Sequence, residues 1–160
     1  MLPAKTRSYL FTALEASPLV LSHLLSKIAV TDPLWDTRPA PDRFTLRGML
    51  AHLADWEPIF RERMTRTTNE NVPLLPNVDE GALALANNYA QTNPLENLAR
   101  YREGRTTLVA FLRTLPNDAF ARTANRELIG VLTLEEQIAL IAGHDGYHAK
   151  QAIEWLQAAP

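Results

Sequence analysis

Four segments of this chain repeat their apolar residues at three- and four-residue steps, the spacing that builds one face of an α-helix. They run from about 4 to 29, from 45 to 67, from 93 to 115 and from 133 to 157, and patterns typical of strands are scarce between them. Each helix must bury its apolar stripe against another element, and four long helices can do so as a bundle. The pattern therefore predicts an all-α fold, a four-helix bundle, in a single domain over residues 1–160.

Residues that cap helices lie at the expected starts of three of these segments. Thr45 is a suitable N-cap for the second helix, and Asn93 followed by Pro94 is a common way to begin a helix such as the third. Thr133 and Glu136 have the spacing of a capping box, in which two residues accept hydrogen bonds from each other's backbone N–H groups. These residues predict where the second, third and fourth helices begin.

Prolines and irregular stretches interrupt the pattern. Pro18 lies inside the first helix and should bend it, with a separate helix capped by Ser17 and beginning at Pro18 as the alternative. Pro58 lies inside the second helix and should bend it. The connection over residues 31–44 is rich in proline, and we expect its Trp35 to plug one end of the bundle, with the wall of a ligand pocket as the alternative. Residues 116–132 have no clear pattern, and we assign no secondary structure to them.

Composition and charge restrict the class of protein. Hydrophobic residues make up 46% of the chain and charged residues 21%, as in ordinary globular domains. A net charge of −2 provides no electrostatic attraction for nucleic acid or for an anionic membrane, and no apolar run is long enough to span a bilayer. Residues 1–7 lack the pattern of a signal peptide, so we expect a cytoplasmic protein that binds a small-molecule substrate.

Three of the four histidines lie on helix faces that should meet inside the bundle. His144 and His148 are four residues apart, so their imidazoles rise from one face of the fourth helix on successive turns. His52 lies near the apolar stripe of the second helix. Because the chain has no cysteine, the three imidazoles would form an all-nitrogen site that suits Zn²⁺, Ni²⁺, Fe²⁺ or Mn²⁺ and leaves a position open. A hydrogen-bonded core histidine is the alternative for each, and we expect His23 to pack in the core.

Two carboxylates near these histidines are candidates for orienting an imidazole by accepting a hydrogen bond from it. Asp55 follows His52 by about one turn, and Asp145 follows His144 directly. Helical geometry places Asp55 closer to its histidine's face than Asp145, although exposure to solvent is the alternative for both. Glu57 is a poorer candidate, because it should point away from His52.

Three further residues are candidates for the surroundings of the site. Gln151, three residues after His148, could hydrogen-bond a ligand or could simply lie on the helix surface. Trp56 and Tyr147 could line a pocket, with aromatic core packing as the alternative.

Two stretches of the chain resemble a known family. Residues 44–57 (FTLRGMLAHLADWE) resemble the second-helix signature of the DinB-like superfamily, also called DinB/YfiT-like, and residues 143–151 (GHDGYHAKQ) resemble its His-x-x-x-His motif. The order and spacing of the expected helices also match. The resemblance implies an antiparallel four-helix bundle that binds one divalent metal through His52, His144 and His148.

The resemblance also implies a homodimer. The first and third helices carry apolar residues over more than one face, Phe11 and Val20 in the first and Val109 and Phe111 in the third. We therefore expect two bundles to associate through such faces.

Characterised members of the family include S-transferases that use low-molecular-weight thiols such as bacillithiol, and mycothiol-dependent maleylpyruvate isomerases. The leading interpretation is a metal-dependent S-transferase, in which the metal holds a small thiol as the thiolate that attacks an electrophile. A non-catalytic metal- or ligand-binding stress protein and a metal-dependent hydrolase stay open, because function depends on the surroundings of the site. The arginines are dispersed along the sequence and indicate no carboxylate-binding cluster, and the sequence assigns no catalytic residue.

Overall fold

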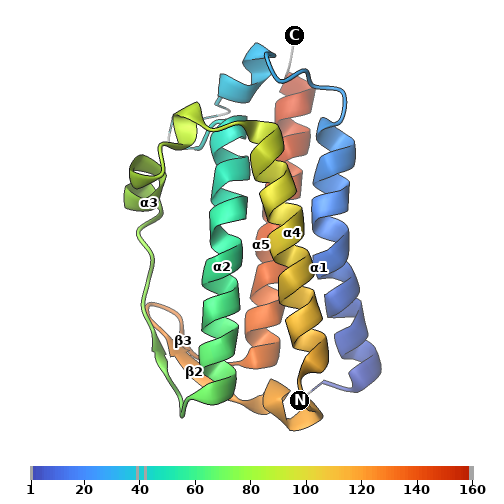
Figure 1. The fold of residues 1–160 in the computed structure, drawn as a ribbon, viewed down its shortest axis with the longest axis vertical. Coiled ribbons are helices and arrows are strands. Elements are labelled where there is room, and N and C mark those ends of the chain that lie inside the picture. The colour runs from blue at the N-terminus through green and yellow to red at the C-terminus, as the bar shows by residue number, and fades with distance from the viewer. Residues whose placement is uncertain (1, 39, 42, 159–160) are drawn as a thin grey trace.

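The computed structural model describes residues 2–38, 40–41 and 43–158. Four long helices form a bundle, which confirms the predicted all-α architecture (Figure 1). None of the helices within the described residues has the length and apolar character needed to cross a membrane. The bundle helices are α1 (Ala4–Leu25), α2 (Leu46–Asn69), α4 (Pro94–Thr114) and α5 (Leu134–Ala158).

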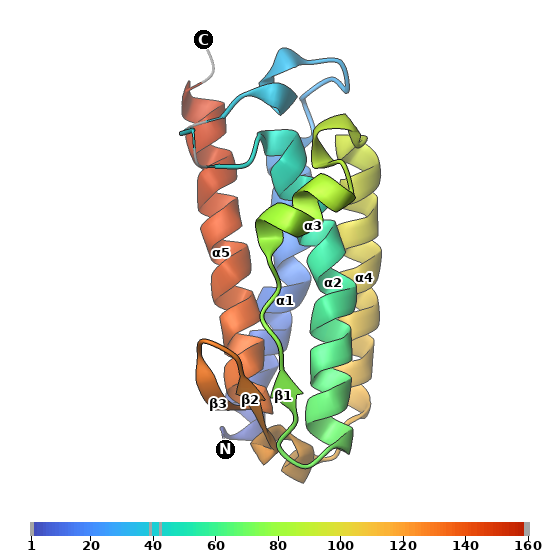
Figure 2. The same ribbon diagram turned by 90° about the vertical axis from the view of Figure 1, so that its left-hand side faces the viewer.

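The bundle is not antiparallel throughout, which corrects the expectation from the family resemblance. In Figure 1, α1 and α5 run from the end near the N-terminus towards the opposite end, whereas α2 and α4 run back. The cause is the long connection over residues 70–93, which returns the chain along the outside of the bundle before α4 begins (Figure 2). This connection contains β1 (Leu74–Leu75), α3 (Glu80–Ala86) and a 3₁₀ turn (Tyr89–Gln91).

The helices begin where the capping residues predicted. The Thr45 hydroxyl accepts a hydrogen bond from the Gly48 N–H at 3.0 Å, and the Asn93 side chain caps the first turn of α4. Thr133 and Glu136 form the capping box, with the Glu136 N–H 3.2 Å from the Thr133 hydroxyl and the Thr133 N–H 2.7 Å from the Glu136 carboxylate. The caps satisfy backbone donors that the helices leave unpaired.

The connection after α1 closes one end of the bundle. The first helix ends at Leu25, earlier than its apolar pattern suggested, and a 3₁₀ turn over Pro33–Asp36 follows. Trp35 of this turn is fully buried, and its indole N–H donates a hydrogen bond to the Ala29 carbonyl at 2.8 Å. Trp35 is therefore core packing, as expected. Positions 39 and 42 of the predicted connection lie outside the described residues.

The stretch left unassigned by the sequence contains two short strands. A 3₁₀ turn (Asn117–Ala121) leads into β2 (Thr123–Arg126), which pairs in parallel with β1 and antiparallel with β3 (Gly130–Thr133). Gly130, the first residue of β3 after the turn from β2, has a φ of 102°, a conformation that favours glycine. Segments of four residues are too short to show a clear strand period, so the sequence did not reveal them.

The buried core is divided into two apolar clusters, each with members from all four bundle helices. One cluster contains Leu21, Trp35, Tyr101 and Trp155, and the other contains Leu14, Phe60, Leu108 and Ile138 among others. Buried histidines and charged residues of α2, α4 and α5 lie where the two clusters meet. A polar layer thus crosses the middle of the bundle.

Most of the apolar residues that suggested a dimer interface pack within the chain. Val109 is buried, Phe11 lies 6.1 Å from Phe120 between ring centroids, and the guanidinium of Arg61 covers the Phe111 ring at 3.5 Å. Val20 is exposed. These helix faces therefore provide less support for a dimer interface than expected, and the homodimer stays a prediction.

Candidate metal centre

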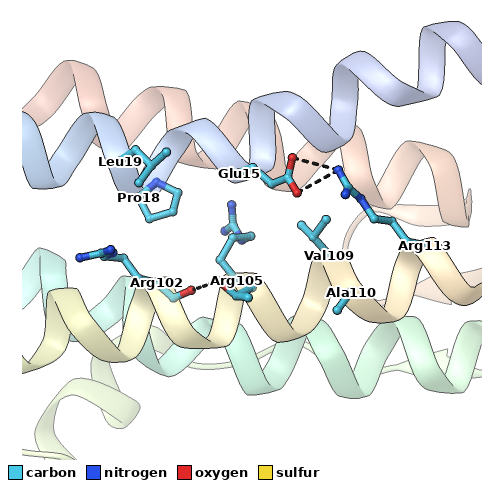
Figure 3. A pocket seen from close by; sticks show the side chains of 9 residues that line it. Glu15, Pro18, Leu19, Arg102, Arg105, Val109, Ala110 and Arg113 are labelled. Atoms are coloured by element: carbon cyan, nitrogen blue, oxygen red, sulfur yellow. Dashed lines mark hydrogen bonds and ion pairs between the residues drawn. The ribbon is translucent and has the colours of Figure 1, made fainter.

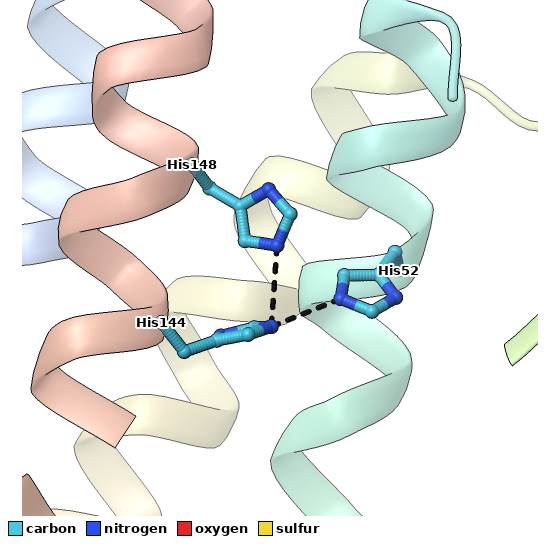
Figure 4. Close-up of side chains that lie close together, drawn as sticks. All are labelled: His52, His144 and His148. Carbon is cyan, nitrogen blue, oxygen red and sulfur yellow. Dashed lines mark hydrogen bonds between the residues drawn. The ribbon is translucent and has the colours of Figure 1, made fainter. Parts of the chain in front are cut away.

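The structure brings together the three histidines that the sequence singled out. His52 comes from α2, and His144 and His148 come from successive turns of α5 (Figure 4). The His144 Nε2 atom lies 3.0 Å from the His52 Nε2 and 3.2 Å from the His148 Nε2. His52 and His148 are buried and His144 is half-buried. The three ring nitrogens therefore converge in the polar layer.

This arrangement fits one divalent metal ion. Each residue offers one ligand atom, and these atoms all lie within 4.8 Å of one another. A tetrahedral ion bound to nitrogen at about 2.0–2.1 Å separates its ligand atoms by roughly 3.3–3.4 Å, close to the two separations found here. Three lone pairs directed at one point also repel each other unless a cation or proton lies between them. The three histidines could therefore hold a metal.

Burial keeps two of these imidazoles neutral. Removal from water, reinforced by the neighbouring imidazoles, lowers the pKa of His52 to about 2 and the pKa of His148 to about 4. A neutral imidazole is the form that binds a metal, because its unprotonated nitrogen carries the lone pair. The folded chain thus holds His52 and His148 in the protonation state that coordination requires.

Gln151 orients His148. The His148 Nδ1–H donates to the Gln151 Oε1 at 2.8 Å, which leaves the Nε2 lone pair free to face the other histidines. The Gln151 amide donates in turn to the Tyr147 hydroxyl at 3.1 Å. Gln151 is buried, so it is part of the site rather than a surface amide. Tyr147 is exposed, and its ring packs edge-on against His148 with 5.2 Å between centroids.

The two candidate carboxylates behave differently from what helical geometry suggested. Asp55 accepts hydrogen bonds from Asn87 and Arg100, each at 2.7 Å, and makes no hydrogen bond to His52 among the described residues. It therefore does not orient that histidine. The prediction compared positions on a single helix and could not account for the groups that α3 and α4 bring next to Asp55.

Asp145 lies closer to its histidine. Its Oδ1 atom is 3.7 Å from the His144 Nδ1, too long for a hydrogen bond but close enough to attract an N–H group on that nitrogen. Burial alone would raise the pKa of Asp145, but His144 and Arg105 together lower it, so the group is a carboxylate. The other partner of this carboxylate, Arg105, also binds Glu57, and all three side chains are no more than 1% exposed.

A cavity of about 260 Å³ opens onto the three histidines. Phe44 lies on one side, with its ring centroid 5.3 Å from that of His52, and the guanidinium of Arg43 lies 5.3 Å from the centre of the Tyr147 ring. Glu80, at the start of α3, contributes a carboxylate to the same wall. The pocket therefore presents a cation, an anion and aromatic surface beside the ring nitrogens.

Trp56 lies behind the histidines. It is buried, and its ring centroid is 5.8 Å from His52 and 6.1 Å from His144. It does not line the cavity. Core packing, the alternative weighed for Trp56, is the role that the structure supports.

A sequence model of the DinB superfamily matches residues 13–152, and both histidine motifs fall within this range. The chain belongs to the DinB superfamily. Its structure is also similar to that of YfiT from Bacillus subtilis, described as a probable metal-dependent hydrolase with an unusual four-helix bundle topology. The TM-score is 0.90 at 24% identity, and the match covers 98% of this chain and 89% of the other. None of the curated proteins matches the chain.

The resemblance to the DinB superfamily pointed to the histidines but not to every residue of the site. Arg43 and Glu80 line the cavity and Arg105 lies under it, and the sequence predicted none of these roles. Arg105 gave a detectable signal, since it occupies an apolar-stripe position between Tyr101 and Leu108. Glu80 gave none, because its place depends on the path of the long connection.

His23, in contrast, is exposed on α1 rather than packed in the core. A second cavity, of about 440 Å³, lies between α1 and α4 (Figure 3). Glu15 and Arg113, two of its lining residues, form an ion pair between α1 and α4 at 2.9 Å, and none of the lining residues is a histidine. Among the described residues, the histidines of α2 and α5 form the group that could hold an ion, so the DinB motif region is the candidate site.

Proposed function

We propose that this DinB-superfamily chain is a divalent-metal-dependent S-transferase that joins a low-molecular-weight thiol to a small electrophile. The observation that carries the proposal is the convergence of three imidazole nitrogens at the wall of an open cavity. A divalent metal bound there would lower the pKa of a thiol or a water at its free position. Since the chain contains no cysteine, a sulfur nucleophile must come from a second molecule.

The residues around the cavity support binding of a charged small molecule. Arg43 is half-buried at the cavity wall, where its guanidinium can bind an anionic group of a thiol or an electrophile. Phe44 and Tyr147 provide aromatic surface for the apolar part of the same molecule. Gln151 holds the His148 ring at the wall of the same cavity.

Metal-dependent hydrolysis is the second candidate, and Glu80 is the observation that favours it. Its carboxylate lines the same cavity as the histidines and could accept a proton from an attacking water. The description of YfiT as a probable metal-dependent hydrolase supports this alternative by similarity of fold alone.

The two candidates are separated by assaying one metal-loaded preparation for both reactions. We expect Zn²⁺-, Ni²⁺-, Mn²⁺- or Fe²⁺-reconstituted protein to conjugate cysteine-derived thiols to a chloronitroaromatic electrophile, and the His144→Ala variant to lose this activity. Arg43→Ala should raise KM for thiols that carry a carboxylate and leave KM for neutral thiols unchanged. Hydrolysis of model esters without thiol conjugation, lost in Glu80→Gln, would contradict the S-transferase and support the hydrolase. Absence of both activities would contradict both.

A further inference from the structure

Beneath the histidines, the middle layer of the bundle contains a buried ion network formed by Glu57, Arg105 and Asp145. The Arg105 Nε donates to the Glu57 carboxylate at 3.1 and 3.2 Å. Its Nη2 donates to Glu57 at 2.6 Å and to Asp145 at 3.1 Å. Its Nη1 donates to the Leu14 carbonyl at 3.1 Å and also to Asp145. All five N–H groups of the guanidinium therefore have partners.

With both carboxylates ionised, the network carries an excess of negative charge. Burial raises the pKa of Glu57, and the neighbouring Arg105 opposes that shift. Two carboxylates surround one guanidinium, and none of the three side chains is more than 1% exposed. Burying a charge without compensation is costly, because water no longer solvates it. Asp145 is the carboxylate of the network that faces the histidines, since its Oδ1 is 3.7 Å from the His144 Nδ1. That Nδ1 is buried and has no hydrogen-bond partner within the described part of the chain.

The packing of α2 against α4 makes room for the second carboxylate. A Cβ atom at Gly104 would lie 2.5 Å from the Glu57 Cβ and 2.8 Å from its Cγ, distances that real contacts do not reach. Position 104 must therefore lack a side chain if Glu57 is to reach Arg105. A structural clamp of α4 to α5 would need only the Arg105–Asp145 pair, so the second carboxylate adds a charge that such a clamp does not require.

We infer that the Glu57–Arg105–Asp145 network is the counter-charge and positioning element for a divalent cation at His52, His144 and His148. Asp145 attracts the Nδ1–H side of His144 and so directs the Nε2 lone pair towards the other histidines. Arg105 fixes Asp145, and Glu57 restores the negative charge that Arg105 would otherwise cancel. Glu57 and Arg105 thus act through Asp145 and His144 as positioning residues. This inference rests on the metal binding of the proposed function, not on the reaction.

The test is the affinity for Zn²⁺ and Co²⁺, measured by competition with a chromophoric chelator, together with the visible spectrum of the Co²⁺ form. Glu57→Gln should weaken binding about ten- to a hundredfold and alter the Co²⁺ spectrum, while the metal-free variant unfolds at no lower urea concentration than wild type. Asp55→Asn is the matched control. It removes the same charge from the same helix, but its partners are Asn87 and Arg100, so affinity should stay within about twofold of wild type.

Asp145→Asn provides an independent second variant, which serves if Glu57→Gln does not fold. It removes the charge closest to His144 and should weaken binding at least as much as Glu57→Gln. In a His144→Ala background, Glu57→Gln should produce no further loss of affinity, because its effect passes through that histidine.

A folded Glu57→Gln or Asp145→Asn protein with the affinity and Co²⁺ spectrum of Asp55→Asn would overturn the inference and leave the network as a clamp. In that case the proposed function would stand, because the wild type would still bind metal. Wild-type protein that binds metal tightly but catalyses neither reaction would instead overturn the proposed function and leave the inference intact. Wild-type protein that binds no ion would overturn both.

Discussion

At the scale of single residues, Gln151 decides which nitrogen of His148 is available to a metal. Its Oε1 accepts the proton of Nδ1, and the hydroxyl of Tyr147 fixes the other end of the amide. Replacing Gln151 by Ala should lower metal affinity about ten- to a hundredfold, because the ring loses its preferred tautomer and orientation. Isothermal titration of the metal-free protein measures this. Gln157→Ala, an exposed glutamine on the same helix, is the control and should leave the affinity unchanged.

The pKa shifts of two histidines predict a pH dependence of the metal-free protein. With pKa values of about 2 for His52 and about 4 for His148, both rings stay neutral in the folded state below pH 6.5, whereas the unfolded chain takes up protons there. The unfolded state then binds more protons, so the free energy of unfolding should fall as pH falls, by about 1.4 kcal/mol per pH unit for each histidine. Urea unfolding with chelator present, between pH 7.5 and 5, checks this.

A matched pair of variants tests whether the buried histidines cause this decline of stability with falling pH. His52→Ala should lower stability at every pH but show a shallower decline with acidity, since one of the two proton-linked groups is gone. His23→Ala should keep the wild-type slope, because this ring is exposed in the folded state. A wild-type stability that is flat from pH 7.5 to 5 would show that the two imidazoles are not held neutral.

The residues of the site were predictable where a single helix determines their position. Two observations were enough to predict that three imidazoles meet. These were the spacing of His144 and His148 and the place of His52 near an apolar stripe. The roles of Asp55 and Asp145 were not predictable, because each carboxylate is satisfied by an arginine of α4. Which arginine faces which carboxylate depends on the relative position of two helices.

At the scale of elements, Gly104 controls the approach of α4 to α2. Its replacement by Ala should lower the free energy of unfolding by about 1–3 kcal/mol, because the new methyl group collides with the root of the Glu57 side chain. Gly146→Ala is the control on α5, where nothing lies within 4 Å of an added Cβ. There the helix propensity of alanine should raise stability by up to about 1 kcal/mol. Equal effects of the two substitutions in urea unfolding would contradict the close contact.

The ends of the helices could be predicted better than the connections between them. Thr45, Asn93 and Thr133 cap helices through bonds to their own backbone neighbours, so local sequence is sufficient. The strands are different, because β1 pairs with β2 some fifty residues later, with Leu74 opposite Asn125. A two-residue strand has no period of its own, and only the fold brings it to its partner.

At the scale of the whole molecule, the direction of the helices is the feature that the sequence did not reveal. The apolar periodicity shows that each of four helices buries one face, but it does not show the direction in which each helix runs. The connection over residues 70–93 could have been a loose loop at one end of the bundle, but it crosses the full length of α2. This path places α3 and Glu80 over the histidines, so the same feature determines both the topology and one wall of the cavity.

The division of the core predicts how the protein responds to loss of metal. The two apolar clusters lie on either side of the polar layer and each contacts all four helices, so neither depends on an ion for its packing. Treatment with a chelator should therefore leave the helical circular dichroism spectrum unchanged while lowering the Tm, since a ligand that binds only the folded state stabilises it. Loss of helical signal on chelation would show that the metal is required for folding.

The most direct test of the account is the metal content and affinity of four alanine variants. Wild-type protein reconstituted with Zn²⁺, Ni²⁺, Mn²⁺ or Fe²⁺ at neutral pH should bind one ion per chain. His52→Ala, His144→Ala and His148→Ala should each lose a large part of the affinity, and the triple variant should not bind, because the ligand atoms within 4.8 Å of one another are removed. His23→Ala should match the wild type. If the wild type binds no more metal than the triple variant, the three histidines are not a metal site, and the proposed metal-dependent activity is contradicted with it.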